Sequence, residues 1–213
     1  MFNLDPITIL LTIPGVLIGL SFHEFAHAIV SDRLGDPTPR NQGRLTLSPL
    51  PHIDIIGFIL IAIVGFGWAK PVQINTRYYR NPRRDEILVS IAGPLMNLAV
   101  AFIFTVFIKI SLVISLDSMV SGNLYQAIIN ILFYTIHINI MLFVFNLIPI
   151  PPLDGFHVLA NIIPARNYKI VYTLERYGFI ILILIVVTPA ASYIISPPIR
   201  FLLNALFTLM GIS

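Results

Sequence analysis

The sequence contains no cysteine and few charged residues. Without cysteine there can be no disulfide, no thiolate ligand for a metal and no cysteine nucleophile. Charged residues make up 11% of the 213 positions, whereas a soluble domain usually carries about 25%. A shortage of this size argues against a soluble protein and leaves no room for a separate soluble domain of ordinary size.

Apolar residues take the place of charge, and they come in long runs. Hydrophobic residues make up 57% of the chain, and the mean hydropathy is +0.89. A run of about 20 apolar residues can cross a bilayer as a helix. Such runs lie at about 6–29, 87–116, 124–148, 171–187 and 190–210. We therefore expect an all-α polytopic membrane protein with about five to six transmembrane helices.

A further apolar segment, 55–68, is short for a span. Its length of about 14 residues suits a re-entrant element that enters the membrane and returns to the same side. Just before it, residues 43–50 (GRLTLSPL) alternate in character, which is typical of a short strand or hairpin. The expected fold therefore includes a short re-entrant or β-hairpin element.

Lysine and arginine cluster in a few connections, and this clustering predicts the orientation in the membrane. Basic residues flank the 55–68 segment on both sides and also separate the runs at 124–148 and 171–187. They are Arg33, Arg40, Arg44, Lys70, Arg77, Arg80, Arg83, Arg84, Arg166, Lys169 and Arg176. Because cytoplasmic loops carry an excess of basic residues, we place these connections in the cytoplasm and the N-terminus outside. The pattern is an orientation signal rather than a nucleic-acid footprint, so no nucleic-acid partner is expected.

The first apolar run contains HEFAH, from His23 to His27. Helix residues four apart lie on one face, about one turn from each other, so the two imidazoles can both reach one zinc ion. Glu24 is poorly aimed to be a third strong ligand, but it can accept a proton from a water at the metal. The motif therefore indicates metal-assisted hydrolysis.

The membrane context makes HEFAH more specific than the same match in a soluble helix. A carboxylate in the middle of a membrane helix costs at least about 2.5–3.5 kcal/mol on insertion scales, and such residues are functional by default. The alternative is a polar patch that joins helices by hydrogen bonds. We favour the metal site over this alternative.

Asp154 is the best candidate for a third ligand, because a catalytic zinc site usually has three. It is the only acidic residue between Asp117 and Glu175. The prolines within 149–152 break the preceding apolar run, and irregular backbone at membrane depth needs protein or a water-filled cavity around it. If both helices descend toward the cytoplasm, His27 and Asp154 lie at similar depth. The alternative is that Asp154 only caps the helix that follows it.

Three motifs in this order resemble the site-2 protease family of intramembrane zinc metalloproteases. They are HEFAH, AGPLMN (92–97) early in a later span, and NLIPIPPLDG (146–155) after another. The segment GWAKPVQIN (67–75) and the lack of an inserted soluble domain look like the compact prokaryotic type without a PDZ domain. By this resemblance one Zn²⁺ per chain is bound, with Asp154 as the third ligand and Glu24 as the catalytic base. The catalytic core would occupy about 6–165 and the C-terminal helices about 166–213 of a single domain, 1–213.

Four further residues are candidates for substrate binding or for contacts to the ligands. Asn97 and Asn146 match motif asparagines of the family and would lie near the active site. His157 is three residues after Asp154 and can share its helical face, as a partner of the ligands or a substitute for one. His52 lies at the entry to the 55–68 segment, where a loop cap or a gate at the cytoplasmic mouth is the main expectation.

The expected activity is hydrolysis of peptide bonds within or next to transmembrane segments of membrane-protein substrates. The expected location is the cell membrane, with multiple spans, the active site toward the cytoplasm and a possible homo-oligomer. An unwound substrate could pair with the 43–50 segment by strand addition. The alternatives are a membrane zinc-binding protein or transporter, and an inactive homologue that binds transmembrane helices without cutting them.

Overall fold

The computed structural model describes residues 5–57, 60, 67–164 and 167–212. Within these ranges the regular structure is helical, apart from one isolated β-bridge. The helices are α1 (Pro6–Arg33), α2 (Thr38–Asn41), η1 (Leu50–His52), η2 (Thr76–Tyr78), α4 (Pro82–Val113), α5 (Leu116–Met119), α6 (Gly122–Asn146), α7 (Asp154–Ile162), α8 (Tyr168–Val187), α9 (Ala190–Ile194) and α10 (Ser196–Leu209).

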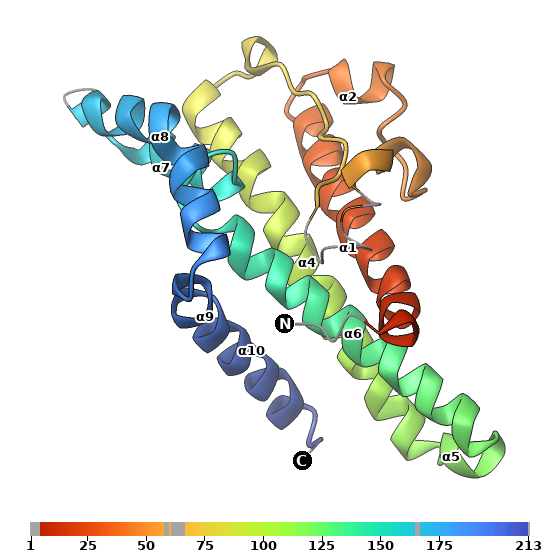
Figure 1. Ribbon diagram of the computed structural model, residues 1–213. Coiled ribbons are helices and arrows are strands. Elements are labelled where there is room, and N and C mark those ends of the chain that lie inside the picture. Colours follow the sequence, from red (N-terminus) through yellow and green to blue (C-terminus); the bar gives the residue numbers. More distant parts are fainter. Residues whose placement is uncertain (1–4, 58–59, 61–66, 165–166, 213) are drawn as a thin grey trace.

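Three long helices, α1, α4 and α6, pack against one another at the centre of the molecule (Figure 1). Small residues on α1 permit this packing. A Cβ at Gly15 would lie 2.8 Å from Cα of Thr135, and one at Gly19 would lie 2.8 Å from Cδ1 of Leu142. Both partners belong to α6, so the two glycines allow the backbones of α1 and α6 to approach closely. This approach places the HEFAH motif of α1 inside the bundle.

Five helical segments of the described chain are long and apolar enough to cross a membrane. They are Pro6–Arg33, Pro82–Val113, Gly122–Asn146, Tyr168–Val187 and Ala190–Leu209. Large apolar side chains such as Leu112 and Val113 are exposed on α4, as expected of an apolar helix that crosses a bilayer. The expectation of an all-α polytopic membrane protein is confirmed, and these five segments coincide with the five long apolar runs.

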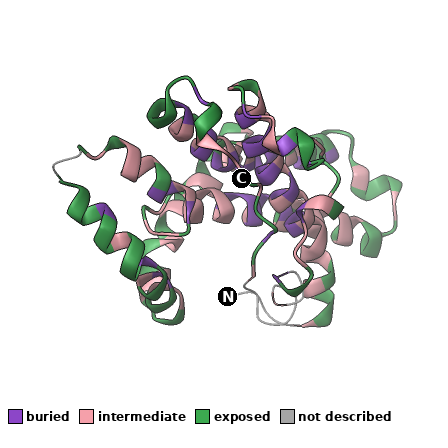
Figure 2. Cartoon of the chain, turned by 90° about the horizontal axis from the view of Figure 1, so that it is seen from above, coloured by how far each residue is buried: buried purple, intermediate pink, exposed green. Residues whose placement is uncertain are grey.

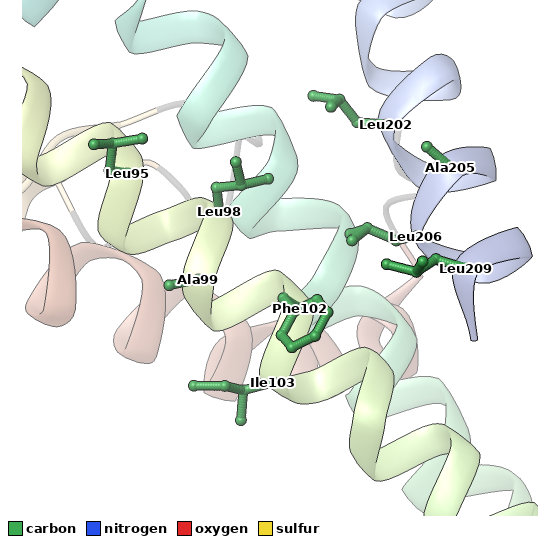
Figure 3. A pocket seen from close by; sticks show the side chains of 9 residues that line it. All are labelled: Leu95, Leu98, Ala99, Phe102, Ile103, Leu202, Ala205, Leu206 and Leu209. Atoms are coloured by element: carbon green, nitrogen blue, oxygen red, sulfur yellow. The ribbon is translucent and has the colours of Figure 1, made fainter.

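The C-terminal helices lie at one side of the bundle (Figure 1), and the buried residues gather toward the middle of the molecule (Figure 2). In their most apolar windows only 17% and 6% of residues are buried, against 28% to 39% in α1, α4 and α6. One contact of α10 with the bundle is a buried apolar cluster that contains Ile199, Ala101 and Ile136. An open apolar cleft of about 620 Å³ lies between α10 and α4, lined by side chains such as Leu202 and Leu95 (Figure 3). These helices support the bundle but contribute no ligand to the site described below.

The strand expected at 43–50 does not form. Local contacts replace a β-ladder there, because the amide of Ser48 donates to Oγ1 of Thr46 (3.1 Å) and Nε2 of His52 donates to the carbonyl of Thr46 (2.9 Å). Prolines flank Leu50, and the chain enters the 3₁₀ helix η1. Prolines disfavour a strand because they lack the backbone donor, so the alternating pattern predicted the wrong local structure.

The 55–68 segment lies mostly outside the described residues, but its two ends are described. Ile53 and Ala69 form an isolated antiparallel bridge, and the amide of Lys70 donates to the carbonyl of His52 at 2.8 Å. The chain therefore leaves and returns at the same place. The expectation of a re-entrant element stays a prediction, because most residues between these two ends lie outside the described ranges.

Candidate metal centre

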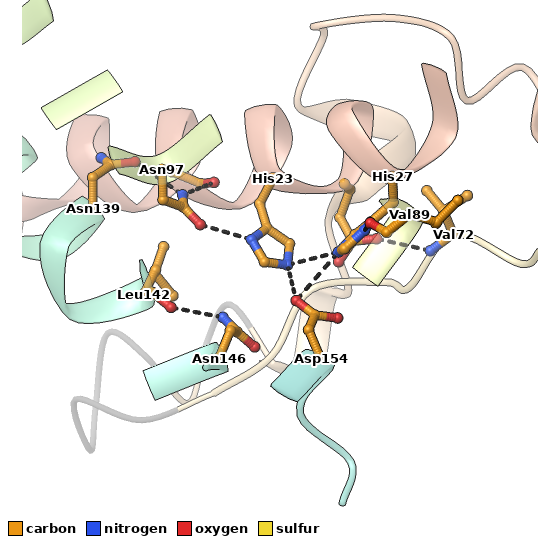
Figure 4. A network of polar contacts seen from close by, with 11 residues as sticks. His23, His27, Val72, Val89, Asn97, Asn139, Leu142, Asn146 and Asp154 are labelled. Carbon is orange, nitrogen blue, oxygen red and sulfur yellow. Dashed lines mark hydrogen bonds and ion pairs between the residues drawn. The ribbon is translucent and has the colours of Figure 1, made fainter. Parts of the chain in front are cut away.

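Two imidazoles of α1 and one carboxylate of α7 converge inside the bundle (Figure 4). His23 and His27 are one helical turn apart, and their Nε2 atoms lie 3.0 Å from each other. Oδ2 of Asp154 lies 3.1 Å from Nε2 of His23 and 3.4 Å from Nε2 of His27. Asp154 therefore lies at the depth of His27, as the sequence indicated. Three atoms that could bind a metal ion, from two distant parts of the chain, therefore lie within 4.8 Å of one another.

The outer nitrogens of the two rings fix their tautomers. Nδ1 of His23 lies 2.7 Å from Oδ1 of Asn97, and Nδ1 of His27 lies 2.7 Å from the carbonyl oxygen of Val89. Carbonyl oxygens only accept, so Nδ1 of each ring carries the proton. In a neutral imidazole the lone pair is then on Nε2. Both Nε2 lone pairs consequently point toward each other and toward a carboxylate oxygen.

Such an arrangement is repulsive unless a positive charge lies between the three atoms. Oδ2 of Asp154 is buried and accepts no hydrogen bond from any described residue, which is rare for a buried polar atom. Ligand atoms about 2.1 Å from a tetrahedral zinc ion lie about 3.4 Å apart. The separations of 3.0, 3.1 and 3.4 Å are close to this value. The three residues therefore fit a zinc ion in charge, ligand type and spacing.

Two glycines, one in AGPLMN (92–97) and one in NLIPIPPLDG (146–155), allow close contacts at the site. A Cβ on Gly93 of α4 would collide with the rings of His23 and His27, so only glycine fits opposite the two imidazoles. A Cβ on Gly155 would collide with the backbone of Leu147 at the end of α6. The connection from α6 to α7 can therefore fold tightly back on itself, and this fold brings the carboxylate of Asp154 to the imidazoles.

Asp154 does not cap α7, which was the alternative interpretation of this residue. The N-cap position is occupied by Leu153, whose side chain makes no capping hydrogen bond. Asp154 is the first helical residue, and its carboxylate turns away from the helix toward the imidazoles.

Glu24 lies beside the three converging atoms and is not one of them. It is a buried residue of α1, and its Oε2 accepts a hydrogen bond from the backbone N–H of Val72 at 2.8 Å. Its Oε1 accepts no hydrogen bond from any residue that the structure describes. One oxygen is thus held in place, and the other is available to take up a proton.

Buried amides orient the ring of His23. Nδ2 of Asn97 donates to the carbonyl of Gly19 (2.9 Å) and to Oδ1 of Asn139 (3.0 Å), so Oδ1 of Asn97 faces His23. Asn139 in turn donates to the carbonyl of Thr135 at 2.8 Å. Outer partners of this kind fix the orientation of a metal-binding histidine and raise its affinity for the metal. Asn97 is therefore close to the site, where the resemblance placed it.

The other three candidate residues do not touch the three converging atoms. Nδ2 of Asn146 donates to the carbonyl of Leu142, within α6 (3.0 Å). Nδ1 of His157 pairs with Oε1 of Glu86 at 3.2 Å, its side chain is 49% exposed, and this hydrogen bond raises the pKa of His157. His157 is thus not a substitute ligand here. His52 is fully buried and ties the 43–50 segment to Lys70, which is closer to the expected loop cap than to a gate.

Comparison of the sequence with known proteins assigns this chain to a protein family. The chain is 40% identical over 186 residues to a protein of Bacillus subtilis named "Putative zinc metalloprotease YwhC", and the match covers 85% of this chain and 82% of that protein. The chain belongs to peptidase family M50. The family model itself matches residues 109–188.

More distant relatives of this M50 protein carry the same kind of name. One is Rip2 of Mycolicibacterium smegmatis, 28% identical over 189 residues, with 86% of this chain and 69% of that protein covered. Another is MJ0611 of Methanocaldococcus jannaschii, 31% identical over 158 residues, with 74% and 73% covered. Both names begin with "Putative zinc metalloprotease", as that of YwhC does. No solved structure matches the chain.

Sequence reasoning about this M50 protein missed several residues that hold the site together. Asn139 carried a usable signal, because an amide in the middle of an apolar span is expensive and usually hydrogen-bonded. The carbonyl of Val89 and the amide of Val72 carried none, since every residue type offers the same backbone groups. Gly93 belonged to a motif, but its role depends on which side chains lie opposite.

Proposed function

We propose that this protein is an intramembrane zinc metalloprotease that hydrolyses peptide bonds within or next to transmembrane segments of membrane-protein substrates. Membership of peptidase family M50 makes the chain a zinc metalloprotease. The intramembrane part of the proposal rests on the position of the site within the fold. The two imidazoles and Glu24 lie in α1, a helix long and apolar enough to cross the bilayer, so the peptide bond must reach them at membrane depth.

Each site residue has a role in this proposal. Nε2 of His23, Nε2 of His27 and Oδ2 of Asp154 would hold the zinc ion, while Asn97 keeps the ring of His23 in the correct tautomer. A bound zinc ion supplies a Lewis acid and lowers the pKa of water toward about 7. Glu24 would take the proton from the attacking water on its free Oε1 and return it to the leaving amine.

The carboxylate of Glu24 is well suited to this proton transfer. A general base must lie within hydrogen-bond reach of the proton that it removes, and Glu24 is adjacent in sequence to His23. Its Oε2 is occupied by the amide of Val72 at 2.8 Å, so the transferred proton would go to Oε1. Asn146, at the end of α6, remains a candidate for binding the backbone of the substrate.

Two observations disfavour the alternative functions. A zinc transporter needs donor groups along a path to both faces, but in the described part of the chain only His23, His27 and Asp154 form a group of three possible ligands. An inactive homologue would lack the base or a ligand, whereas Glu24 and all three donors are present.

The proposal predicts metal-dependent cleavage of a membrane substrate. Purified protein in liposomes should cut a single-span test protein whose helix carries a glycine- or proline-rich segment, because an exposed backbone is required for attack. A zinc chelator should remove the activity and added Zn²⁺ should restore it, with products identified by mass spectrometry. Cleavage that survives complete removal of the metal would contradict the proposal, and zinc uptake into the liposomes without cleavage would favour the transporter.

We also propose that the active site opens toward the cytoplasm. Eight of the 13 lysine and arginine residues lie between Arg33, at the end of α1, and Arg84, in the first turn of α4, and cytoplasmic connections carry such an excess. Because the chain has no cysteine, single cysteines at Asn41, Asn81 and Asn123 give a clean test with an impermeant thiol reagent. The first two should react only from the cytoplasmic side and the third only from outside; reaction of Asn41→Cys and Asn81→Cys from opposite sides would refute the scheme.

A further inference from the structure

A short stretch of chain, the 70–75 segment, runs without regular secondary structure between the bridge at Ala69 and η2. Its backbone is tied down at both ends. The amide of Lys70 donates to the carbonyl of His52 (2.8 Å), and the amide of Asn75 donates to Oδ2 of Asp36 (2.7 Å). Between these ties, the amide of Val72 donates to Oε2 of Glu24 at 2.8 Å. The segment therefore reaches the base of the proposed reaction through its backbone.

Asp36 is a fixed anchor for one end of this segment. Burial raises the pKa of the Asp36 carboxyl, but hydrogen bonds from Thr38, Asn75 and Ser31 outweigh burial and lower it. The carboxylate is fully buried and also accepts from Oγ of Ser31 at 2.9 Å. Since Ser31 belongs to α1, Asp36 connects the 70–75 segment to the helix that carries Glu24.

Arg44 holds the same segment from the other side. Its guanidinium donates to the carbonyl of Lys70 at 3.0 Å and to the carbonyl of Pro71 at 3.4 Å. The residue is only 5% exposed, and it forms no ion pair with any described carboxylate. Burying a guanidinium without a carboxylate partner is costly, so its two backbone contacts are the visible compensation. These contacts lie immediately before the amide that binds Glu24.

We infer that Arg44 is a positioning residue for Glu24, which acts by fixing the backbone of the 70–75 segment so that the amide of Val72 holds one oxygen of the catalytic carboxylate. The inference rests on the proposed function. The chain of contacts runs from Arg44 to the carbonyls of Lys70 and Pro71, through one peptide unit to the amide of Val72, and then to Oε2 of Glu24. Arg44 touches neither substrate nor metal in this scheme.

A held carboxylate has a specific advantage for the reaction. A free glutamate side chain can rotate, and only some orientations direct an oxygen toward the attacking water. With Oε2 occupied by the Val72 amide, Oε1 is the oxygen left for the proton. Misplacement of a reacting group by about 1 Å can cost about 100-fold in rate, while binding of the substrate need not change. The expected effect of losing Arg44 is therefore on kcat rather than on KM.

The first test replaces Arg44 and measures both catalysis and the 70–75 segment. Arg44→Gln should lower kcat by about 10- to 100-fold, leave KM within about threefold, and keep the zinc content. In the zinc-free and the zinc-loaded protein alike, hydrogen–deuterium exchange of the Val72 amide should become about tenfold faster. Arg44→Lys, which retains one donor, should recover part of both effects. Arg40→Gln is the matched control, because the side chain of Arg40 is exposed and pairs with Asp32 rather than with the 70–75 segment.

A second variant removes the donor directly. Val72→Pro deletes the backbone N–H that binds Glu24 and leaves Arg44 in place. If the Arg44 variants fold poorly, this variant still tests whether that N–H positions Glu24. It should lower kcat as Arg44→Gln does. Gln73→Pro is its control, since the amide of Gln73 makes no hydrogen bond within the described chain, and it should cost at most about threefold.

The outcomes separate this inference from the proposed function. If the wild type cleaves while Arg44→Gln and Val72→Pro cleave at the wild-type rate, the inference is wrong and the proposed function stands. Loss of kcat without faster exchange at Val72, or a rise in KM alone, would also overturn it. If the wild type cleaves no membrane substrate, the proposed function fails; if Glu24→Gln cleaves normally, only the role of Glu24 as the base fails. In both cases the exchange measurements on the zinc-free protein still report whether Arg44 holds the segment.

Discussion

Replacement of Glu24 by glutamine should abolish proteolysis while leaving the metal in place. Glutamine has the size of glutamate, and its carbonyl oxygen can still accept the hydrogen bond from Val72, but it cannot take up a proton. General acid–base catalysis contributes about 10²- to 10⁴-fold to a rate, so kcat should fall by that amount. The three donors from His23, His27 and Asp154 are untouched, and one zinc ion per chain should remain.

The measurement combines single-turnover cleavage of the test substrate with metal analysis of the same preparation. Glu86→Gln is a suitable control, because Glu86 is a partly buried carboxylate near the same end of the bundle that pairs with the exposed His157. It should cleave at close to the wild-type rate. Normal cleavage by Glu24→Gln would show that another group removes the proton.

Replacement of Asp154 by asparagine should remove the metal itself. Asparagine keeps the shape of the side chain but offers no negative charge to the point where the lone pairs of His23 and His27 meet. Loss of a residue that only orients a ligand costs about 10- to 100-fold in metal affinity. Loss of the sole carboxylate ligand should cost more than this, and activity should disappear with the zinc.

Zinc titration monitored by thermal unfolding gives a readout that does not depend on catalysis. A ligand that binds only the folded state raises its stability, so added Zn²⁺ should raise the unfolding temperature of the wild type but hardly that of Asp154→Asn. Asp117→Asn, an exposed change on the short helix α5, should behave as the wild type. Equal stabilisation of Asp154→Asn by zinc would remove Asp154 from the ligand set.

The membrane helices and the three donors were accessible to sequence reasoning for definite physical reasons. An apolar run long enough to span a bilayer has few alternatives to a helix, so the five long runs predicted five helices. His23 and His27 are neighbours through the helical repeat alone. Asp154 stood out because an isolated carboxylate after a long apolar run needs a partner.

The contacts between the loop segments and the site were not accessible in this way. The alternating pattern of 43–50 suggested a strand, but local hydrogen bonds of Thr46 and His52 prevail there. The bond from Val72 to Glu24 joins residues 48 positions apart and uses a backbone donor that every non-proline residue has. In the sequence, Arg44 indicated only that its connection lies in the cytoplasm. In the structure its guanidinium donates to backbone carbonyls of the 70–75 segment.

The hydrogen bonds on the outer nitrogens of the two imidazoles also determine the electrical balance of the centre. Because Asn97 and Val89 offer neutral oxygens to Nδ1, both rings can bind a metal ion as uncharged imidazoles, and the carboxylates beside it are those of Glu24 and Asp154. A divalent cation cancels those two negative charges, so the loaded centre is neutral overall. Without the cation the same carboxylates lack its positive charge in a medium that solvates charge poorly. Metal capture and stable insertion of α1 into the bilayer should therefore be thermodynamically coupled.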